Sequence, residues 1–304
     1  LWHWGVLRWI TKGFAYVVQR LMGLGGATSL AVSANLFMGM TEAPVLIKPY
    51  LMRMTRSEIF IVMTTGFATI AGSVLVIYVT FLEPVMGNPL SQLLAASLMA
   101  APAAVAIALT MEPETADVSE RAHEPEFASQ STMDAFATGA SDGMKIVLNI
   151  ATMLIAALAL LHIINLMLGV FPDVGEGPLS LQRVLGWIFA PLMYLIGVPW
   201  DEAAKAGSLM GVKTVLTEFV AFIDLGAVPV DEMSDRTRRI VANAICGFAN
   251  FGSIGILIGG LTIIAPDRRE LFLSLAWKTL VSGTLATCAS GAIVGLMPAS
   301  LFAP

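Results

Sequence analysis

Two glutamates occur in largely apolar stretches of sequence, and each directly follows a threonine. Glu42 lies in "NLFMGMTEAP" (residues 35–44), and Glu218 lies in "AGSLMGVKTVLTEFVAFIDLGAV" (residues 206–228). An ionised carboxylate accepts hydrogen bonds, so a pair of them suits a neutral solute with several hydroxyl groups. The alternative is that each glutamate lies at a lipid headgroup boundary or caps a broken helix. The repeated placement favours a water-filled site that both carboxylates face.

Further polar side chains add to such a site. Asn250 and Ser253 are three residues apart, so a helix would place both on one face. Together they offer an amide and a hydroxyl, a mixture that suits the hydroxyl groups of a sugar. Glu42, Glu218 and Thr41 could instead form an acid–base set for an intramembrane enzyme. The sequence offers no serine–histidine or metal constellation to support that alternative.

A second group of oxygen atoms could bind a hard cation such as sodium. Asn35 would supply a side-chain carbonyl and Thr69 a hydroxyl, and opened backbone near Met38 and Ile70 would supply further carbonyls. Asn35 and Thr69 could equally make ordinary polar contacts between packed helices, and the residues alone do not choose between the two. No transition-metal site is expected, because the possible ligands are scattered along the chain: His3, His123, His162, Cys246 and Cys288.

The elements that must position these residues are membrane segments. Of the 304 residues, 57% are hydrophobic and 13% are charged, whereas soluble proteins carry about 25% charged residues. We therefore expect an all-α, multi-pass membrane protein, and nothing in the chain is basic enough to bind nucleic acid. A span needs about 20 apolar residues, and the stretches that qualify are 57–83, 90–110, 143–170, 239–264 and 270–297.

Three other segments have different expected positions. Residues 1–22 interleave basic residues with Trp and Phe, a pattern typical of an amphipathic helix at the membrane interface. Residues 111–142 contain an acidic, polar stretch that predicts a loop in water. Residues 179–198 are apolar enough to span, but their Arg, Pro, Trp and Tyr also suit an interfacial helix.

The two glutamate segments belong to an internal repeat. Residues 25–50 and 206–228 are apolar but too interrupted for one straight helix, so each is predicted to enter the membrane and turn back as a re-entrant hairpin. Downstream, "TGFATIAGS" (65–73) is matched by "CGFANFGS" (246–253). If 179–198 stays at the surface, an odd number of crossings separates the copies. Inverted repeats with broken helices are a signature of secondary transporters, and a passive channel would instead need a continuous polar stripe that the spans lack.

Several of these motifs together resemble the concentrative nucleoside transporter family. They are "GMTEAPVLIKPYL", "TIAGSVL", "SLMAAPA", "GVKTVLTEFVAF" and "ICGFANFGSIGILIGGL", and they occur in the family's order. The resemblance implies transmembrane helices, two re-entrant hairpins and interfacial helices, assembled as a homotrimer in the plasma (inner) membrane. It also implies that the family's first helices precede residue 1 and are absent here.

The resemblance assigns a role to each segment. Residues 25–83 and 206–264 would each form a hairpin and a broken helix of a mobile transport domain. Residues 143–170 would belong to a fixed scaffold, and residues 179–198 would be the outer interfacial helix. The transport domain would move past the scaffold to carry its cargo across the membrane.

The resemblance also implies the functional residues. Nucleoside would contact the first hairpin tip, two apolar residues and the ribose-binding set: Gly39, Met40, Thr41, Glu42, Val74, Phe248, Glu218, Asn250 and Ser253. Sodium would bind Asn35, Thr69 and the carbonyls of Met38 and Ile70. Met40 departs from the family, whose better-known members carry Gln there, and a thioether lacks the hydrogen-bonding capacity of an amide. Base selectivity is therefore the property that this position leaves open.

The predicted function is sodium-coupled import of nucleosides of the uridine class. Sodium would order the first hairpin tip and so complete the nucleoside site. The alternative within transport is proton coupling through Glu42 or Glu218. The surviving oxygen ligands favour sodium.

Overall fold

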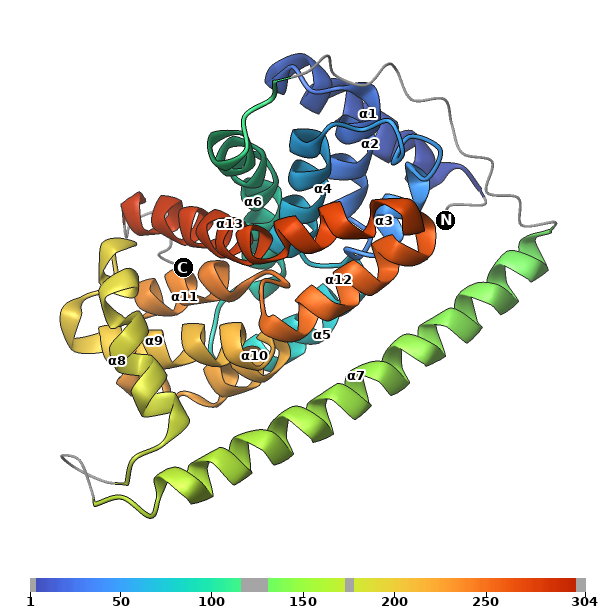
Figure 1. Ribbon diagram of the computed structural model, residues 1–304. Coiled ribbons are helices and arrows are strands. Elements are labelled where there is room, and N and C mark those ends of the chain that lie inside the picture. The colour runs from blue at the N-terminus through green and yellow to red at the C-terminus, as the bar shows by residue number, and fades with distance from the viewer. Residues whose placement is uncertain (1–3, 116–130, 173–177, 299–304) are drawn as a thin grey trace.

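The computed structural model describes residues 4–115, 131–172 and 178–298, and within these ranges the chain is helical with no strand (Figure 1). His3 and His123 lie outside the described residues. The first half contains α1 Val6–Met22, α2 Gly26–Asn35, α3 Glu42–Leu46, α4 Arg56–Ala68, α5 Gly72–Leu82, α6 Pro89–Met111 and α7 Thr132–Leu168. The second half contains α8 Leu181–Leu195, α9 Trp200–Val215, α10 Glu218–Ala227, η1 Val230–Glu232, α11 Asp235–Ile245, α12 Phe251–Ile264, η2 Pro266–Arg268 and α13 Arg269–Leu296.

Several of the described helices have the length and composition of membrane spans. Three qualify outright: the α4–α5 unit over Arg56–Leu82, α6, and Pro266–Leu296, which contains α13. The helices α8 and α9 would add a fourth if counted as one span, but they are bent by 117° at a short break. These findings confirm the expected all-helical membrane fold.

The long helix α7 begins earlier than expected. The polar loop was predicted over 111–142, with residues 116–130 outside the described chain, but α7 already starts at Thr132. The Ser131 hydroxyl caps this helix by accepting from the Asp134 amide at 3.1 Å, and Asp134 adds a favourable negative charge in the first turn. A polar stretch can therefore be helical when it is capped, so the predicted boundary was wrong here.

The same helix stands apart from the rest of the molecule. Figure 1 shows α7 running along one side of the body, and its main packing contact is with α8. Large apolar side chains on its described positions are exposed, among them Met133, Phe136, Ile155 and Leu166. The predicted span 143–170 lies within this helix except for its last two residues.

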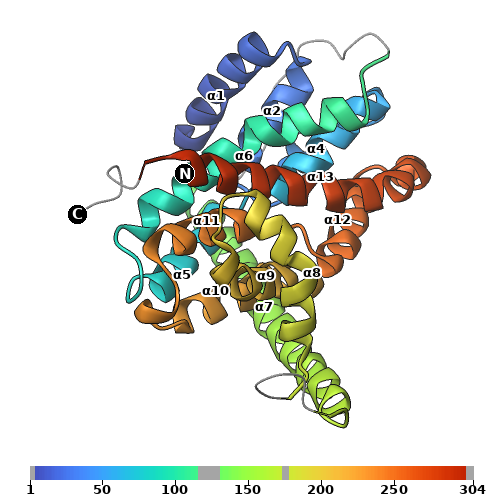
Figure 2. The same ribbon diagram turned by 90° about the vertical axis from the view of Figure 1, so that its left-hand side faces the viewer.

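The remaining helices follow the same order twice. An amphipathic helix, α1 or α8, comes first, then two short helices separated by a break (α2 and α3, α9 and α10), then a broken helix (α4–α5, α11–α12) and a long helix (α6, α13). Figures 1 and 2 show α8 and α9 packed side by side, and Figure 2 shows α1 alongside α2 at the opposite end of the molecule. This succession matches the internal repeat seen in the sequence.

Two hydrophobic clusters form most of the core. One is built mainly from α5 and α8–α11, and the other mainly from α2, α4, α6, α12, α13 and the segment between α3 and α4. Phe248, in the break between α11 and α12, packs against both clusters. The break therefore lies where the two halves of the core meet.

Glycine allows the two broken helices to touch at their breaks. A Cβ on Gly247 would lie 2.8 Å from the Phe67 carbonyl oxygen and 3.0 Å from that of Ala68, at the end of α4. A Cβ on Gly283 of α13 would lie 2.6 Å from the Phe67 side chain. No other residue type permits such close backbone approach, so these glycines set how tightly the breaks pack.

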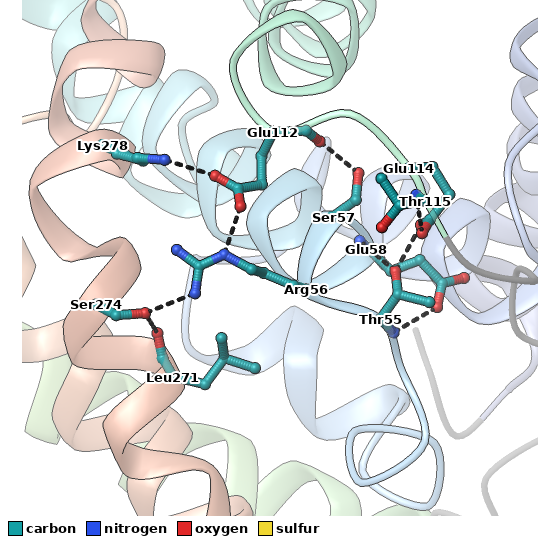
Figure 3. A network of polar contacts seen from close by, with 10 residues as sticks. All are labelled: Thr55, Arg56, Ser57, Glu58, Glu112, Glu114, Thr115, Leu271, Ser274 and Lys278. Atoms are coloured by element: carbon teal, nitrogen blue, oxygen red, sulfur yellow. Dashed lines mark hydrogen bonds and ion pairs between the residues drawn. The ribbon is translucent and has the colours of Figure 1, made fainter.

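A polar network fixes the ends of α4, α6 and α13 to one another (Figure 3). Glu112, directly after α6, pairs with Arg56 at the start of α4 and with Lys278 of α13, whose Nζ is 2.6 Å away. Arg56 also donates to the Ser274 hydroxyl at 3.0 Å. The hydrogen bond from Lys278 is the main cause that lowers the pKa of Glu112 below its ordinary value, and Arg56 lowers it further. Glu112 is thus held as an anion between two cationic helix positions.

Candidate functional site

Helices α9 and α10 are joined close to a buried carboxylate. Glu218 is the first residue of α10, after the N-cap Thr217, whose hydroxyl accepts from the Val220 amide at 3.3 Å. Its Oε2 accepts from Asn250 Nδ2 at 2.8 Å, and its Oε1 accepts from the Tyr78 hydroxyl at 3.0 Å. Only 6% of Glu218 is exposed. Residues from two other elements, Tyr78 of α5 and Asn250 at the start of α12, therefore converge on this carboxylate of α10.

The orientation of the Asn250 amide follows from its own contacts. Asn250 is the N-cap of α12, and its Oδ1 accepts from the Ser253 backbone amide at 2.8 Å. Its Nδ2 must then point to Glu218, where it can only donate. Each carboxylate oxygen of an anion can accept two hydrogen bonds, so Glu218 retains acceptor capacity beyond these two contacts.

Tyr78 was not anticipated from the sequence. It lies one turn after Val74 on α5, so both residues share the face of that helix turned toward the second hairpin. Its ring stacks on Phe222 with centroids 4.3 Å apart and contacts Phe219 edge-on at 5.8 Å. This i, i+4 spacing from a predicted site residue was the signal that could have found it.

Lys213 is a second residue that sequence reasoning passed over. It lies in the last turn of α9, its side chain is fully buried, and its Nζ has no hydrogen-bond partner in the described chain. It interacts electrostatically with Glu218, which follows five residues later across the hairpin tip. A charged residue inside a largely apolar stretch was a signal in the sequence that could have identified Lys213.

Helix ends support the charges of this region. Glu218 begins α10, and its carboxylate accepts from the side chain of Asn250, which caps the start of α12. Helix N-termini carry partial positive charge and stabilise anions, whereas C-termini favour cations. Lys213, at the C-terminal end of α9, follows the same rule with the opposite sign.

The predicted cation ligands lie at helix C-termini. Asn35 is the last residue of α2, and Thr69 is the C-cap of α4. The side chain of Asn35 is fully buried, yet neither its Oδ1 nor its Nδ2 has a hydrogen-bond partner in the described residues. Its Oδ1 lies 3.7 Å from the position of a Cβ on Gly66, one turn before the end of α4. The two helix ends are therefore adjacent and offer a buried, unsatisfied oxygen.

Backbone contacts complete this region. The Gly72 amide, just beyond the α4–α5 break, donates to the Phe37 carbonyl in the α2–α3 break at 3.2 Å. The hydroxyl of Thr69 donates to the Thr65 carbonyl at 2.9 Å, which leaves its lone pairs as acceptors. Ile70 is fully buried and Met38 is half-buried, both in non-helical backbone. The donor set fits a hard, oxygen-seeking cation such as sodium.

The segment between α2 and α3 is less enclosed. Met40 is buried and packs against Gly66, where a Cβ would lie 3.0 Å from Met40 Cβ. Thr41 packs its methyl group on Gly260 of α12. Glu42 is exposed, and its carboxylate folds back over Gly39 of the same tip.

The predicted substrate residues thus fall into two groups. Glu218, Asn250 and Ser253 form one hydrogen-bonded set, whereas Glu42 lies exposed at the other hairpin tip. Val74 is buried on α5, and Phe248 is half-buried at the α11–α12 break. The two glutamates, which the sequence placed in equivalent positions, differ in burial: Glu218 is buried and Glu42 is exposed.

Family models match most of the chain. A model described as the Na+ dependent nucleoside transporter C-terminus matches residues 92–295, and a model described as Nucleoside recognition (Gate) matches residues 1–85. The uncharacterized transporter YutK of Bacillus subtilis is 40% identical over 302 residues, which cover 97% of this chain and 73% of that protein. Nucleoside permease NupC of Helicobacter pylori is 39% identical over 284 residues, covering 92% and 67%.

Mammalian relatives are longer. Sodium/nucleoside cotransporter 1 of Homo sapiens is 37% identical over 316 residues, which cover 98% of this chain and 48% of that protein. The chain therefore spans about half the length of this relative.

Solved structures of one protein, CNTnw, have the same fold. An inward-facing, substrate-bound structure is 42% identical with a TM-score of 0.89, covering 97% of this chain and 71% of that one. A variant in an outward-facing state is 40% identical with a TM-score of 0.90, covering 97% and 71%. The overall fold is thus equally similar to both states.

Proposed function

The chain belongs to the concentrative nucleoside transporter family, and on this premise we propose that it imports nucleosides across the plasma membrane by symport with sodium. Its relatives are transporters and not enzymes. The proposal concerns the coupled ion, the residues that hold each ligand and the movement that carries them.

The ribose part of a nucleoside fits the Glu218 set. Glu218 accepts from Asn250 and Tyr78 and has acceptor capacity left for ribose hydroxyls. Ser253, one turn into α12, would add its hydroxyl, and the buried Val74 and half-buried Phe248 would contact the base through apolar surface. The two hydrogen bonds that the buried Glu218 carboxylate accepts from other elements are the observation that carries this assignment.

The base would also meet the first hairpin tip through Gly39, Met40, Thr41 and Glu42. Met40 offers a polarisable thioether in place of an amide, so its contact with a base would be a sulfur–ring contact instead of a hydrogen bond. Such a contact discriminates weakly between purine and pyrimidine. We therefore expect broader base acceptance than a glutamine at this position would give.

Sodium would bind at the two helix C-termini that end in Asn35 and Thr69. The fully buried Asn35 Oδ1 without a partner supports this, because a buried unsatisfied acceptor is costly unless something binds it. The carbonyls of Met38 and Ile70 would complete the oxygen set. Sodium bound there would neutralise the partial negative charge of both helix ends.

Binding of sodium would favour nucleoside binding by fixing the first hairpin tip. Asn35 ends α2 directly before the α2–α3 break, and the Phe37 carbonyl in that break accepts from Gly72 at 3.2 Å. A cation at Asn35 would therefore hold the tip residues 39–42 against the α4–α5 break. Coupling of this kind is reciprocal, so nucleoside would raise sodium affinity by the same factor.

Movement would follow an elevator-type scheme in a homotrimer. Residues 25–83 and 206–264 would form the hairpins and broken helices of the transport domain, arranged as an inverted repeat, and α7 would belong to the scaffold. The separate position of α7, with exposed apolar side chains, supports this division. The transport domain would carry sodium and nucleoside together past that scaffold.

The experiment is uridine uptake into proteoliposomes that contain the purified protein. An inward sodium gradient should drive uptake, Asn35→Ala should raise the sodium concentration needed for half-maximal uptake, and Glu218→Gln should abolish uptake. The half-exposed Lys205→Met serves as a surface control and should behave as the unaltered protein. Equal uptake without sodium, or uptake driven by a pH gradient in sodium-free buffer, would reject sodium coupling and favour protons.

A further inference from the structure

The buried lysine of the second hairpin has no evident structural partner. Lys213 is fully buried in the last turn of α9, and its Nζ makes no hydrogen bond in the part of the chain that the structure describes. An ammonium buried without compensation is strongly unfavourable. Something near Lys213 must therefore offset its charge.

The groups that interact electrostatically with Lys213 come from several elements. Glu218 of α10 lies across the hairpin tip, Cys246 lies at the end of α11, and Cys288 lies on α13. Tyr78 of α5 faces Glu218 and donates to it. Among the groups in the described residues that interact electrostatically with Lys213, Glu218 is the one carboxylate, so it is the natural counter-charge.

The hairpin geometry favours this pairing. The lysine stands at a helix C-terminus and the glutamate at the following helix N-terminus, so each charge is stabilised by the end on which it lies. Thr217 caps α10 between them and fixes the turn. Both charges can be buried together at the tip, whereas either alone would be left uncompensated.

We propose that Lys213 is a positioning residue that, as the counter-charge of Glu218, keeps this carboxylate an anionic acceptor for ribose hydroxyls. The proposal rests on the proposed function. Lys213 itself does not contact the nucleoside. Its effect is transmitted through Glu218, whose Oε1 and Oε2 already accept from Tyr78 and Asn250.

The proposal predicts a loss that depends on the ligand. Lys213→Met should weaken uridine binding on the order of 10- to 100-fold, the usual value of hydrogen bonds to a charged group. Binding of 2′,3′-dideoxyuridine, which lacks the hydroxyls that Glu218 would bind, should change less than about threefold. Lys213→Gln should behave as Lys213→Met does, because both remove the charge. Lys205→Met, which removes a half-exposed lysine on the same helix that pairs with Glu232, is the matched control and should change neither affinity.

The affinities are measured by calorimetry on the full chain in sodium buffer. A similar loss for both ligands, no loss for uridine, or retained discrimination in Lys213→Gln would overturn the role of Lys213. Unaltered protein that binds uridine no better than the dideoxy analogue would overturn the ribose assignment, and the proposal with it.

Thermal unfolding gives an independent test that needs no ligand. Glu218→Gln leaves the lysine without its counter-charge, so adding Lys213→Met should raise the melting temperature of that variant. In the unaltered protein, Lys213→Met should lower it. A merely structural lysine would lower the melting temperature in both backgrounds, and that result would refute the pairing.

Discussion

The contact between the two broken helices can be tested with one methyl group, in Gly247→Ala. An added Cβ would lie 2.7 Å from the Thr287 methyl, 2.8 Å from the Phe67 carbonyl oxygen and 3.0 Å from the Ala68 carbonyl oxygen. Gly247 does not adopt a left-handed backbone conformation, so alanine can take its φ and ψ without strain. The effect therefore comes from contact alone.

The size of the effect follows from these distances. Ordinary carbon–oxygen contacts lie near 3.3 Å or beyond, so the breaks must separate by roughly 0.5 Å. Overpacking of this kind costs about 1–3 kcal/mol of stability. Thr69 and Ile70 directly follow the displaced carbonyls, so the proposed sodium ligands would move with them. A shift of this size at a ligand set can cost on the order of tenfold in affinity for sodium.

The matched control is Gly255→Ala on α12, where an added Cβ meets nothing within 4 Å. Alanine is favoured over glycine in a helix by about 0.5–1 kcal/mol, so this variant should be at least as stable as the unaltered protein. Melting temperature in detergent and the sodium dependence of uridine uptake are measured for both variants. If Gly247→Ala matches Gly255→Ala in both measurements, the breaks do not pack as described and the reasoning is refuted.

Two further predictions concern single polar side chains. Tyr78→Phe keeps the ring stacked on Phe222 but removes the hydroxyl that donates to Glu218. Because a hydrogen bond to a charged group is worth about 1.5–3 kcal/mol, calorimetry should detect at least a tenfold loss of uridine affinity. An unchanged affinity would contradict the contact. Glu112→Gln removes the ion pairs with Lys278 and Arg56, which lower the pKa of Glu112 in the folded protein. These pairs stabilise the folded protein at pH values above the ordinary glutamate pKa, and this stabilisation is lost as pH falls through the lowered pKa of Glu112. The difference in melting temperature between this variant and the unaltered protein should therefore be constant at neutral pH and shrink in acid. A difference that grows in acid would refute this direction of the pH dependence. Because these pairs are partly exposed, that difference should correspond to less than about 1 kcal/mol and should also shrink in high salt.

The class and most elements of this fold were predictable from the sequence because they depend on local composition. Low charge and long apolar stretches predict membrane helices, and the stretches 57–83, 90–110 and 270–297 correspond to helices that can span. The start of α7 was not predicted, because its first turns are polar and are stabilised by the Ser131 cap instead of apolar burial. Composition identifies the apolar helices that span a membrane, but it does not identify a polar helical extension that depends on its cap.

The candidate site was only partly predictable, for a different reason. Glu218, Asn250 and Ser253 carry polar groups in apolar surroundings, so they stand out in the sequence and are joined in the structure. Tyr78 and Lys213 act on Glu218 from other elements, and their proximity depends on how α5 and α9 pack against α10. The sequence similarity of Glu42 to Glu218 likewise could not predict their different exposure, which is set by the enclosure of each hairpin tip.

The opposite polarity of helix ends offers a physical reason for separate cation and nucleoside sites, as proposed here, in one framework. The first copy presents the C-termini of α2 and α4, where Asn35 and Thr69 lie, and these ends favour a cation. The second copy presents the N-termini of α10 and α12, which support the Glu218 carboxylate and leave it able to accept from a neutral solute. The two arrangements touch at Gly247, whose backbone packs on the end of α4. A cation that stabilises the end of α4 therefore acts on the neighbouring α11–α12 break, which carries Phe248 and Asn250. Direct packing between the two breaks is then sufficient to couple the proposed sites.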